Sequence, residues 1–125
     1  MKVLICGGRS YSDRPRMFRS LDALHADENI NFIIHGACVD RETKQLCGAD
    51  RWAEEWAIER EVPYLGFPAR WTIKGRAAGP IRNGLMLSKA KPDAVAYVSG
   101  GPGTANMVKQ ATEAHVRVIN LEDIA

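Results

Sequence analysis

Short, continuous apolar runs alternate with helical segments along almost the whole chain. Runs in which polar residues do not alternate with apolar ones are typical of parallel strands that are covered on both faces. Five of them are present, at residues 2–6, 31–35, 62–67, 94–98 and 117–121. The sequence therefore predicts an α/β fold, with an open, mainly parallel, five-stranded sheet and helices on both of its faces.

Helical periodicity separates these runs. We expect helices at about residues 14–26, 49–60 and 80–89 and from Thr104 onward. Asp13 and Thr104 are the expected N-caps, and Pro15 suits a first helical turn. Pro63 weakens the third run, so we expect that strand towards an edge of the sheet. The polar segment 39–47 is predicted to be a loop insertion.

Size and composition indicate one globular domain, spanning residues 1–125. The chain is 46% hydrophobic and 26% charged, and its apolar runs are shorter than the ~18 residues that a membrane span needs. We therefore expect a cytoplasmic protein without a membrane partner. The net charge of only +2 argues against a nucleic-acid partner, although Arg outnumbers Lys 11 to 6.

Unusual residues gather where four of the predicted strands end. In parallel α/β sheets ligands bind at the carboxyl edge, at the point where the strand order reverses. The first loop, residues 6–11, follows the first strand. Gly7 and Gly8 there are expected to allow close backbone approach and positive φ, which would leave N–H groups free for an anion. Arg9 would add a guanidinium group that can bind the anion, and Tyr11 an aromatic ring on which a ligand could stack. The alternative is a tight turn with Arg9 in solvent.

The second loop combines residues 35–37 with residues 48–50. The loop is expected not to project far, because it contains the small residues Gly36, Ala37 and Gly48. Asp50 is a candidate acceptor of hydrogen bonds from ribose hydroxyls. The alternative for Asp50 is an ordinary helix N-cap.

The third loop, residues 68–79, carries an aromatic residue and several arginines. Trp71, Arg76 and Gly79 are its candidate ligand contacts, and a solvated charged loop is the alternative. Arg82 and Asn83 are expected in the first turn of the helix that Gly79 and Pro80 open, near the positive end of its dipole.

The fourth loop, residues 99–104, is the most specific motif. It places Gly100, Gly101, Gly103 and Thr104 between a buried strand and a helix, which predicts an anion-binding nest with phosphate as its ligand. The alternative is a flexible turn that binds no ligand.

Metal and cofactor sites receive less support. A zinc set of Cys6, His35, Cys38 and Cys47 lacks the short Cys-x₂₋₄-Cys spacing, so buried packing of Cys6 and His35 is the favoured interpretation. We predict no metal and no cofactor; NAD-dependent chemistry would need a GxGxxG motif after a strand. The odd number of cysteines argues against a disulfide framework, and a Cys38–Cys47 disulfide would require an oxidising setting.

In its motifs the sequence resembles the SLOG superfamily, a Rossmann-like group named after the Smf/DprA and LOG proteins, and within it the YspA-like branch of bacteria and phages. The residues that carry the resemblance are CGGRSYSD at 6–13, HGA at 35–37, GADRWAEEWA at 48–57, ARW at 69–71, GRAAGPIRNGLM at 75–86 and SGGPGT at 99–104. The resemblance implies a Rossmann-like fold and suggests a homo-oligomer; Trp52 and Trp56 are expected in the core or on an assembly surface.

The LOG branch of this superfamily hydrolyses the N-glycosidic bond of nucleoside monophosphates, with a PGGxGTxEE motif and an arginine on the preceding helix. The fourth loop resembles the phosphate-binding part of that motif, and Arg82 resembles the helix arginine. Ser99 replaces the proline, and Asn106 and Met107 stand where the two glutamates would be. Asp50 is then the best remaining catalytic carboxylate.

These features predict a domain that binds a nucleotide or nucleotide-derived phosphorylated ligand at the carboxyl edge, as a sensor or processing domain. An N-glycosidic hydrolase with Asp50 and Arg82 as catalytic residues, acting on nucleoside monophosphates or NAD-derived nucleotides, is the first alternative. A nucleic-acid accessory protein similar to DprA is the second, and the small net charge speaks against it.

Overall fold

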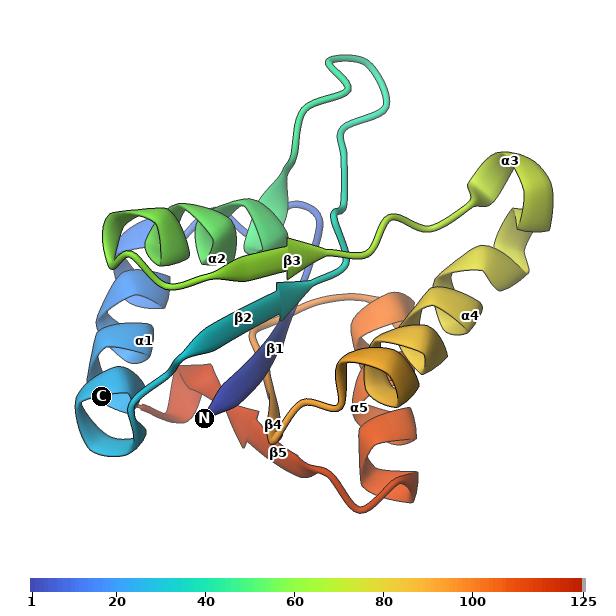
Figure 1. Cartoon of the computed structure of the whole chain (residues 1–125). Helices are drawn as coiled ribbons and strands as arrows, with labels where there is room; N and C mark the ends of the chain where they lie inside the picture. The colour runs from blue at the N-terminus through green and yellow to red at the C-terminus, as the bar shows by residue number, and fades with distance from the viewer. Residues whose placement is uncertain (125) are drawn as a thin grey trace.

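The computed structural model describes residues 1–124 and has a five-stranded, all-parallel sheet with helices on both faces (Figure 1). The strand order is β3-β2-β1-β4-β5. The strands are β1 (Lys2–Cys6), β2 (Phe32–His35), β3 (Tyr64–Gly66), β4 (Ala94–Tyr97) and β5 (Arg117–Asn120). All five predicted strands and the Rossmann-like architecture are confirmed, and β3 lies at an edge as Pro63 indicated.

Five α-helices connect the strands. They are α1 (Arg14–Glu28), α2 (Gly48–Glu59), α3 (Trp71–Lys74), α4 (Ala78–Leu85) and α5 (Pro102–Glu113). A 3₁₀ turn, Gly75–Ala77, joins α3 to α4, a π-helical turn, Met86–Ala90, extends α4, and a second 3₁₀ turn, Leu121–Asp123, follows β5. None of the helices in residues 1–124 is long and apolar enough to cross a membrane.

The start of α1 agrees with its sequence signals. The Asp13 carboxylate accepts the N–H of Arg16 at 3.1 Å, and Pro15 lies in the first turn. This side-chain cap satisfies one of the N–H groups that a helix start leaves without an intrahelical partner.

The start of α5 differs from the prediction. The helix begins at Pro102 with Gly101 as its N-cap, so Thr104 is a residue of the first turn and not the cap. Proline is favoured at the first helical position because its φ is already helical and it has no N–H to satisfy there.

The third loop also differs from the prediction. α3 and the 3₁₀ turn occupy most of it, and α4 begins at Ala78, before Gly79 and Pro80. Arg82 and Asn83 are therefore the fifth and sixth residues of α4, beyond its first turn. The 3₁₀ turn runs directly into α4 because Ala77 and Ala78 both have helical backbone angles.

Two apolar cores hold the layers together. Val3 and Ile5 of β1 point into the core beneath α1 and α2, whereas Leu4 points into the core beneath α4 and α5. Trp56 is fully buried in the first core and donates from Nε1 to Asp22 at 2.9 Å. Trp56 is thus a core residue and not part of an assembly surface.

The segment 39–47 is a loop, as predicted. Val39 and Leu46 form an isolated antiparallel bridge at its base. Figure 1 shows the loop projecting beyond the carboxyl ends of the strands, as α3 also does. The carboxyl edge is therefore flanked by two projecting segments.

Candidate functional site

The point where the strand order reverses lies between the parallel strands β1 and β4. From β1 the chain proceeds to β2 and β3 on one side, and β4 leads to β5 on the other. Ligands of open α/β sheets bind at such a point, outside the carboxyl ends of the strands. The first and fourth loops both begin there.

The first and fourth loops touch each other through glycine. The N–H of Gly8 donates to the carbonyl of Ser99 at 2.8 Å, and a Cβ on Gly8 would lie 3.0 Å from the same oxygen. On the other side of the first loop, a Cβ on Gly7 would lie 2.7 Å from the Cβ of Ala49. These glycines allow a close approach of three chain segments.

The expected backbone conformation of Gly7 and Gly8 is wrong. In residues 1–124, only Gly48 and Gly75 are glycines with positive φ, at 64° and 59°. The N–H of Gly8 is also not free for an anion, because the close approach of the two loops uses it for Ser99. The side chain of Arg9, in the same loop, is exposed to solvent.

Gly48, in the second loop, also allows a close approach of backbone segments, as Gly7 and Gly8 do in the first. Its φ is positive, and a Cβ there would lie 2.5 Å from the carbonyl oxygen of Arg9. The N–H of Ala49 donates to the carbonyl of Gly8 at 3.2 Å. The start of α2 is therefore seated directly on the backbone of the first loop.

The fourth loop forms the start of α5. Its glycines do not have positive φ, so it lacks the alternation of backbone conformations that makes an anion nest. The N–H groups of Gly103 and Thr104 precede the first helical hydrogen bond, which runs from Ala105 to Gly101 at 3.1 Å. What the loop offers an anion is the amino end of a helix.

A hollow of about 540 Å³ opens beside this helix start. It is lined by Tyr97, Val98, Ser99, Gly100, Gly101, Thr104, Ala105, Val108 and Lys109. Sequence reasoning missed Tyr97 and Lys109 because neither lies in a motif. The helical spacing that brings Thr104, Ala105, Val108 and Lys109 to one side of α5 is the signal that could have found Lys109.

Glu122 is a further residue that the sequence did not indicate. Its carboxylate accepts both the N–H and the hydroxyl of Ser99, each at 2.6 Å. The first N–H of the fourth loop is therefore already occupied by an anionic group of the protein itself.

Asp50 is buried in the second loop, with 7% of its surface exposed. Its Oδ2 accepts the N–H of Cys38 at 3.0 Å. Burial raises the pKa of Asp50, against the opposing effects of His35, the N–H of Cys38 and Arg82. The N-cap alternative is wrong, since Asp50 is the third residue of α2 and accepts from the preceding loop.

His35 is fully buried and its ring is satisfied on both sides. Nδ1 accepts the N–H of Ala37 at 3.0 Å, so the ring proton lies on Nε2, which donates to Glu54 at 2.9 Å. Burial raises the pKa of the neighbouring Cys6 thiol to about 12. In residues 1–124 no group of three or more His, Cys, Asp and Glu side chains is arranged to hold a metal ion.

Arg82 reaches from α4 across the carboxyl edge. Its Nη1 donates to the carbonyls of Gly36 and, at 3.3 Å, Phe67, and its Nε donates to Asn83 at 3.0 Å. Asn83 in turn donates to the carbonyl of Gly103 at 3.3 Å and to Asn106 at 3.1 Å. Arg82 and Asn83 thus connect the second loop with the fourth.

Burial lowers the pKa of Arg82, against the opposing effect of Asp50. Among the predicted site residues, the structure brings Asp50, Gly36 and Arg82 together beneath the surface.

Three other predicted site residues, Trp71, Arg76 and Tyr11, are not part of this group around Asp50 and Arg82. Trp71 is 51% exposed and packs on Gly79, where a Cβ would lie 3.0 Å from Cη2 of the indole. Arg76 is exposed on the 3₁₀ turn. Tyr11 packs partly buried against the core beneath α1 and α2, and its hydroxyl is buried.

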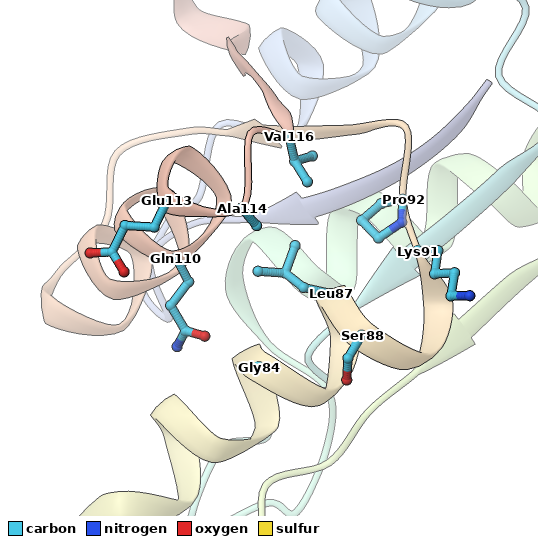
Figure 2. Close-up of a pocket in the computed structure, with 9 residues that line it drawn as sticks. All are labelled: Gly84, Leu87, Ser88, Lys91, Pro92, Gln110, Glu113, Ala114 and Val116. Atoms are coloured by element: carbon cyan, nitrogen blue, oxygen red, sulfur yellow. The ribbon is translucent and has the colours of Figure 1, made fainter.

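A second hollow, of about 570 Å³, lies between α5 and the π-helical end of α4 (Figure 2). Lys91, Pro92 and Val116 line it close to the amino ends of β4 and β5. It is therefore at the opposite edge of the sheet, and none of the predicted site residues lines it.

Residues 1–73, more than half of the chain, match the family model of the YAcAr family, described as the YspA, cpYpsA-related SLOG family. The chain belongs to this SLOG family. No curated protein and no solved structure matched the chain. Membership of a SLOG family suggests a nucleotide-related role in ligand binding or processing. The matched SLOG region contains the first and second loops and ends before Arg82 and the fourth loop.

Proposed function

We propose that this SLOG-family protein binds a nucleotide or a nucleotide-derived phosphorylated ligand at the carboxyl edge of its sheet. The observation that carries the proposal is the open hollow beside the start of α5, at the carboxyl end of β4. A phosphoryl group there would accept the N–H groups of Gly103 and Thr104 and the Thr104 hydroxyl.

The hollow also has features that suit the rest of a nucleotide. Among its lining residues, Tyr97 provides an aromatic ring and Lys109 an ammonium group. Lys109 is exposed, and its Nζ lies as far as 4.0 Å from the Glu113 carboxylate. It can therefore turn to a phosphate without breaking a close ion pair.

The charge of the third loop supports an anionic ligand. Residues 62–92 contain six basic residues and no acidic one. Arg70, Lys74 and Arg76 are exposed, and in the described part of the chain none of them forms an ion pair. Arg14, Arg51, Arg60 and Arg117, in contrast, are each paired with a carboxylate. These three unpaired cations lie on the segment that follows the carboxyl end of β3, where they would attract phosphates.

The arrangement favours binding over hydrolysis. Asn106 stands where the LOG motif has a glutamate, and its Oδ1 accepts from both Asn83 and Gln110, at 3.1 and 2.7 Å. An amide held in this way cannot supply the negative charge that an oxocarbenium-like transition state needs.

N-glycosidic hydrolysis remains the second candidate, because Asp50 lies close enough to Arg82 for their charges to interact. In that case Asp50 would supply the carboxylate and Arg82 would hold the phosphate. The raised pKa of Asp50 suits a proton donor more than a nucleophile.

Binding is tested by NMR titration with AMP, CMP, NAD and inorganic phosphate. We expect the amide signals of Gly100, Gly101, Gly103 and Thr104 to move, and Thr104→Val and Lys109→Ala each to weaken binding by about tenfold. Lys91→Ala, which removes an exposed lysine at the opposite edge, is the matched control and should bind as the unchanged protein does. Unmoved signals at millimolar nucleotide and phosphate would refute the proposal.

Hydrolysis is tested by incubating the same nucleotides with the protein and measuring free base by chromatography. Release of base that Asp50→Asn abolishes would establish the enzyme. Binding without release of base would establish the sensor.

A further inference from the structure

Cys38 and Cys47 face each other at the base of the projecting loop. Their Sγ atoms are 3.8 Å apart, and the N–H of Cys47 donates to the carbonyl of Cys38 at 2.9 Å. The next pair outward, Val39 and Leu46, forms the antiparallel bridge. The two cysteines are therefore opposite residues of a short antiparallel stem, and both are free, partly exposed thiols.

This geometry meets the requirements of a disulfide. Opposite residues of an antiparallel pair have Cα atoms about 4.5–5.5 Å apart, within the range of about 4.4–6.8 Å that disulfides span. The side chains already point towards each other, with their Sγ atoms 3.8 Å apart, and a disulfide brings the sulfurs to about 2.05 Å. The third cysteine, Cys6, lies on β1 beneath the loops and not in this stem.

We propose that Cys38 and Cys47 are a reversible oxidation site, which closes the base of the loop with a disulfide when the protein meets a peroxide or a small-molecule disulfide. With peroxide, one thiolate attacks an oxygen, which breaks the O–O bond and yields a sulfenic acid and water. The second thiol then displaces the sulfenic hydroxyl as another water, forming the S–S bond. The two thiols lose two electrons and two protons, and the peroxide takes up both.

Either thiol of the pair can react first. Burial, together with the hydrogen bond between the two sulfurs, raises the pKa of Cys47 to about 11, with Arg9 opposing the shift. The reaction begins at whichever sulfur loses its proton to become the thiolate. The other thiol, whose Sγ is 3.8 Å away, is then positioned to resolve the sulfenic acid.

Closing the stem has a structural consequence at the candidate site. The N–H of Cys38 is a hydrogen-bond donor to Asp50, so the stem is attached to the start of α2. A disulfide would restrict the chain between the two cysteines, since it removes conformations in which the stem opens. The loop beside the carboxyl edge would become less mobile.

The test is oxidation of the full chain with hydrogen peroxide or with oxidised glutathione, followed by mass spectrometry. We expect the intact mass to fall by two hydrogen atoms and dithiothreitol to restore it. After unfolding and trypsin digestion without reductant, the peptide 20–41 should be linked to the peptide 45–51. Both measurements are made without any nucleotide, so their outcome is independent of ligand binding.

Variants separate this pair from the other cysteine. Cys6→Ser should form the disulfide as the unchanged protein does, whereas Cys38→Ser and Cys47→Ser should not form it. With peroxide, Cys38→Ser and Cys47→Ser should each instead accumulate sulfenic acid on the cysteine of the pair that remains. A stable glutathione adduct on either cysteine of the unchanged protein, a link that includes Cys6, or a link between two chains would each overturn the proposal.

Discussion

The guanidinium of Arg82 donates from Nη1 to the carbonyl oxygen of Gly36, 46 residues earlier in the chain. The contact joins α4 to the loop after β2 across the carboxyl edge. It is possible because Gly36 has no side chain: a Cβ there would lie 2.6 Å from Nη1 and 2.8 Å from Cζ. The position of the Arg82 guanidinium therefore depends on a glycine in another loop.

Gly36→Ala should displace Arg82 and destabilise the protein by about 1–3 kcal/mol, because the new methyl group overlaps a half-buried guanidinium. Urea unfolding followed by circular dichroism measures the loss. The matched control is Gly84→Ala, whose Cβ would meet only the flexible end of Gln110, at 3.3 Å. That variant should gain about 0.5–1 kcal/mol, since alanine favours the helix. Equal stabilities of the two variants would contradict the role given to Gly36.

Alanine substitutions at Gly48 and Gly75 distinguish the energetic cost of backbone strain from that of steric overlap. Their φ angles, 64° and 59°, are nearly the same. A Cβ on Gly75 would meet nothing within 4 Å, whereas one on Gly48 would meet the backbone of Arg9. Gly75→Ala should cost about 1 kcal/mol, from φ alone. Gly48→Ala should cost about 3 kcal/mol or more, because neither backbone can move away. Thermal unfolding compares the two, and similar losses would show that the loops do not meet as closely as described.

Cys6 predicts an alkaline loss of stability. Burial raises its pKa from an ordinary value of 9.0 to about 12 in the folded protein, so the unfolded chain loses the proton first as the pH rises. The stability present below pH 9 is therefore lost progressively above it, by about 2 kcal/mol at about pH 10.5. Cys6→Ala lacks this loss, whereas the titration of Cys47 is common to both proteins. Parallel urea curves for the two proteins at about pH 8 and pH 10.5 test the prediction, which fails if their stability difference stays constant.

Glu122 should oppose the binding of an anion at the fourth loop. Glu122→Gln keeps an acceptor for Ser99 but removes the charge, so it should destabilise the protein by about 1 kcal/mol. The same change should strengthen binding of a phosphorylated ligand severalfold, because a negative charge beside the loop is gone. Calorimetric titration and urea unfolding measure the two effects. Asp123→Asn removes an exposed charge from the adjacent residue, which is not bonded to the loop in the described structure, and should change both less.

Local signals predicted the framework of this protein. Apolar runs gave the positions of the strands because a strand buried on both faces needs apolar residues at successive positions. Pro63 indicated the edge strand, and Asp13 with Pro15 indicated the start of α1. The start of α5 was misplaced because two signals, Pro102 and Thr104, compete within three residues, and proline at the first helical position prevailed.

Only the tertiary structure decided what the polar residues of the candidate site contact. Asp50 accepts from Cys38, Arg82 reaches Gly36, and Glu122 holds Ser99. Each of these contacts depends on how a helix packs on the sheet and on the order of the strands, which no local pattern contains. The glycines show the same division. Their positions after the strands, and the close backbone approach that Gly7 and Gly8 allow, could be predicted from the chain. Which backbone segments they bring together became visible only when three loops met at one edge.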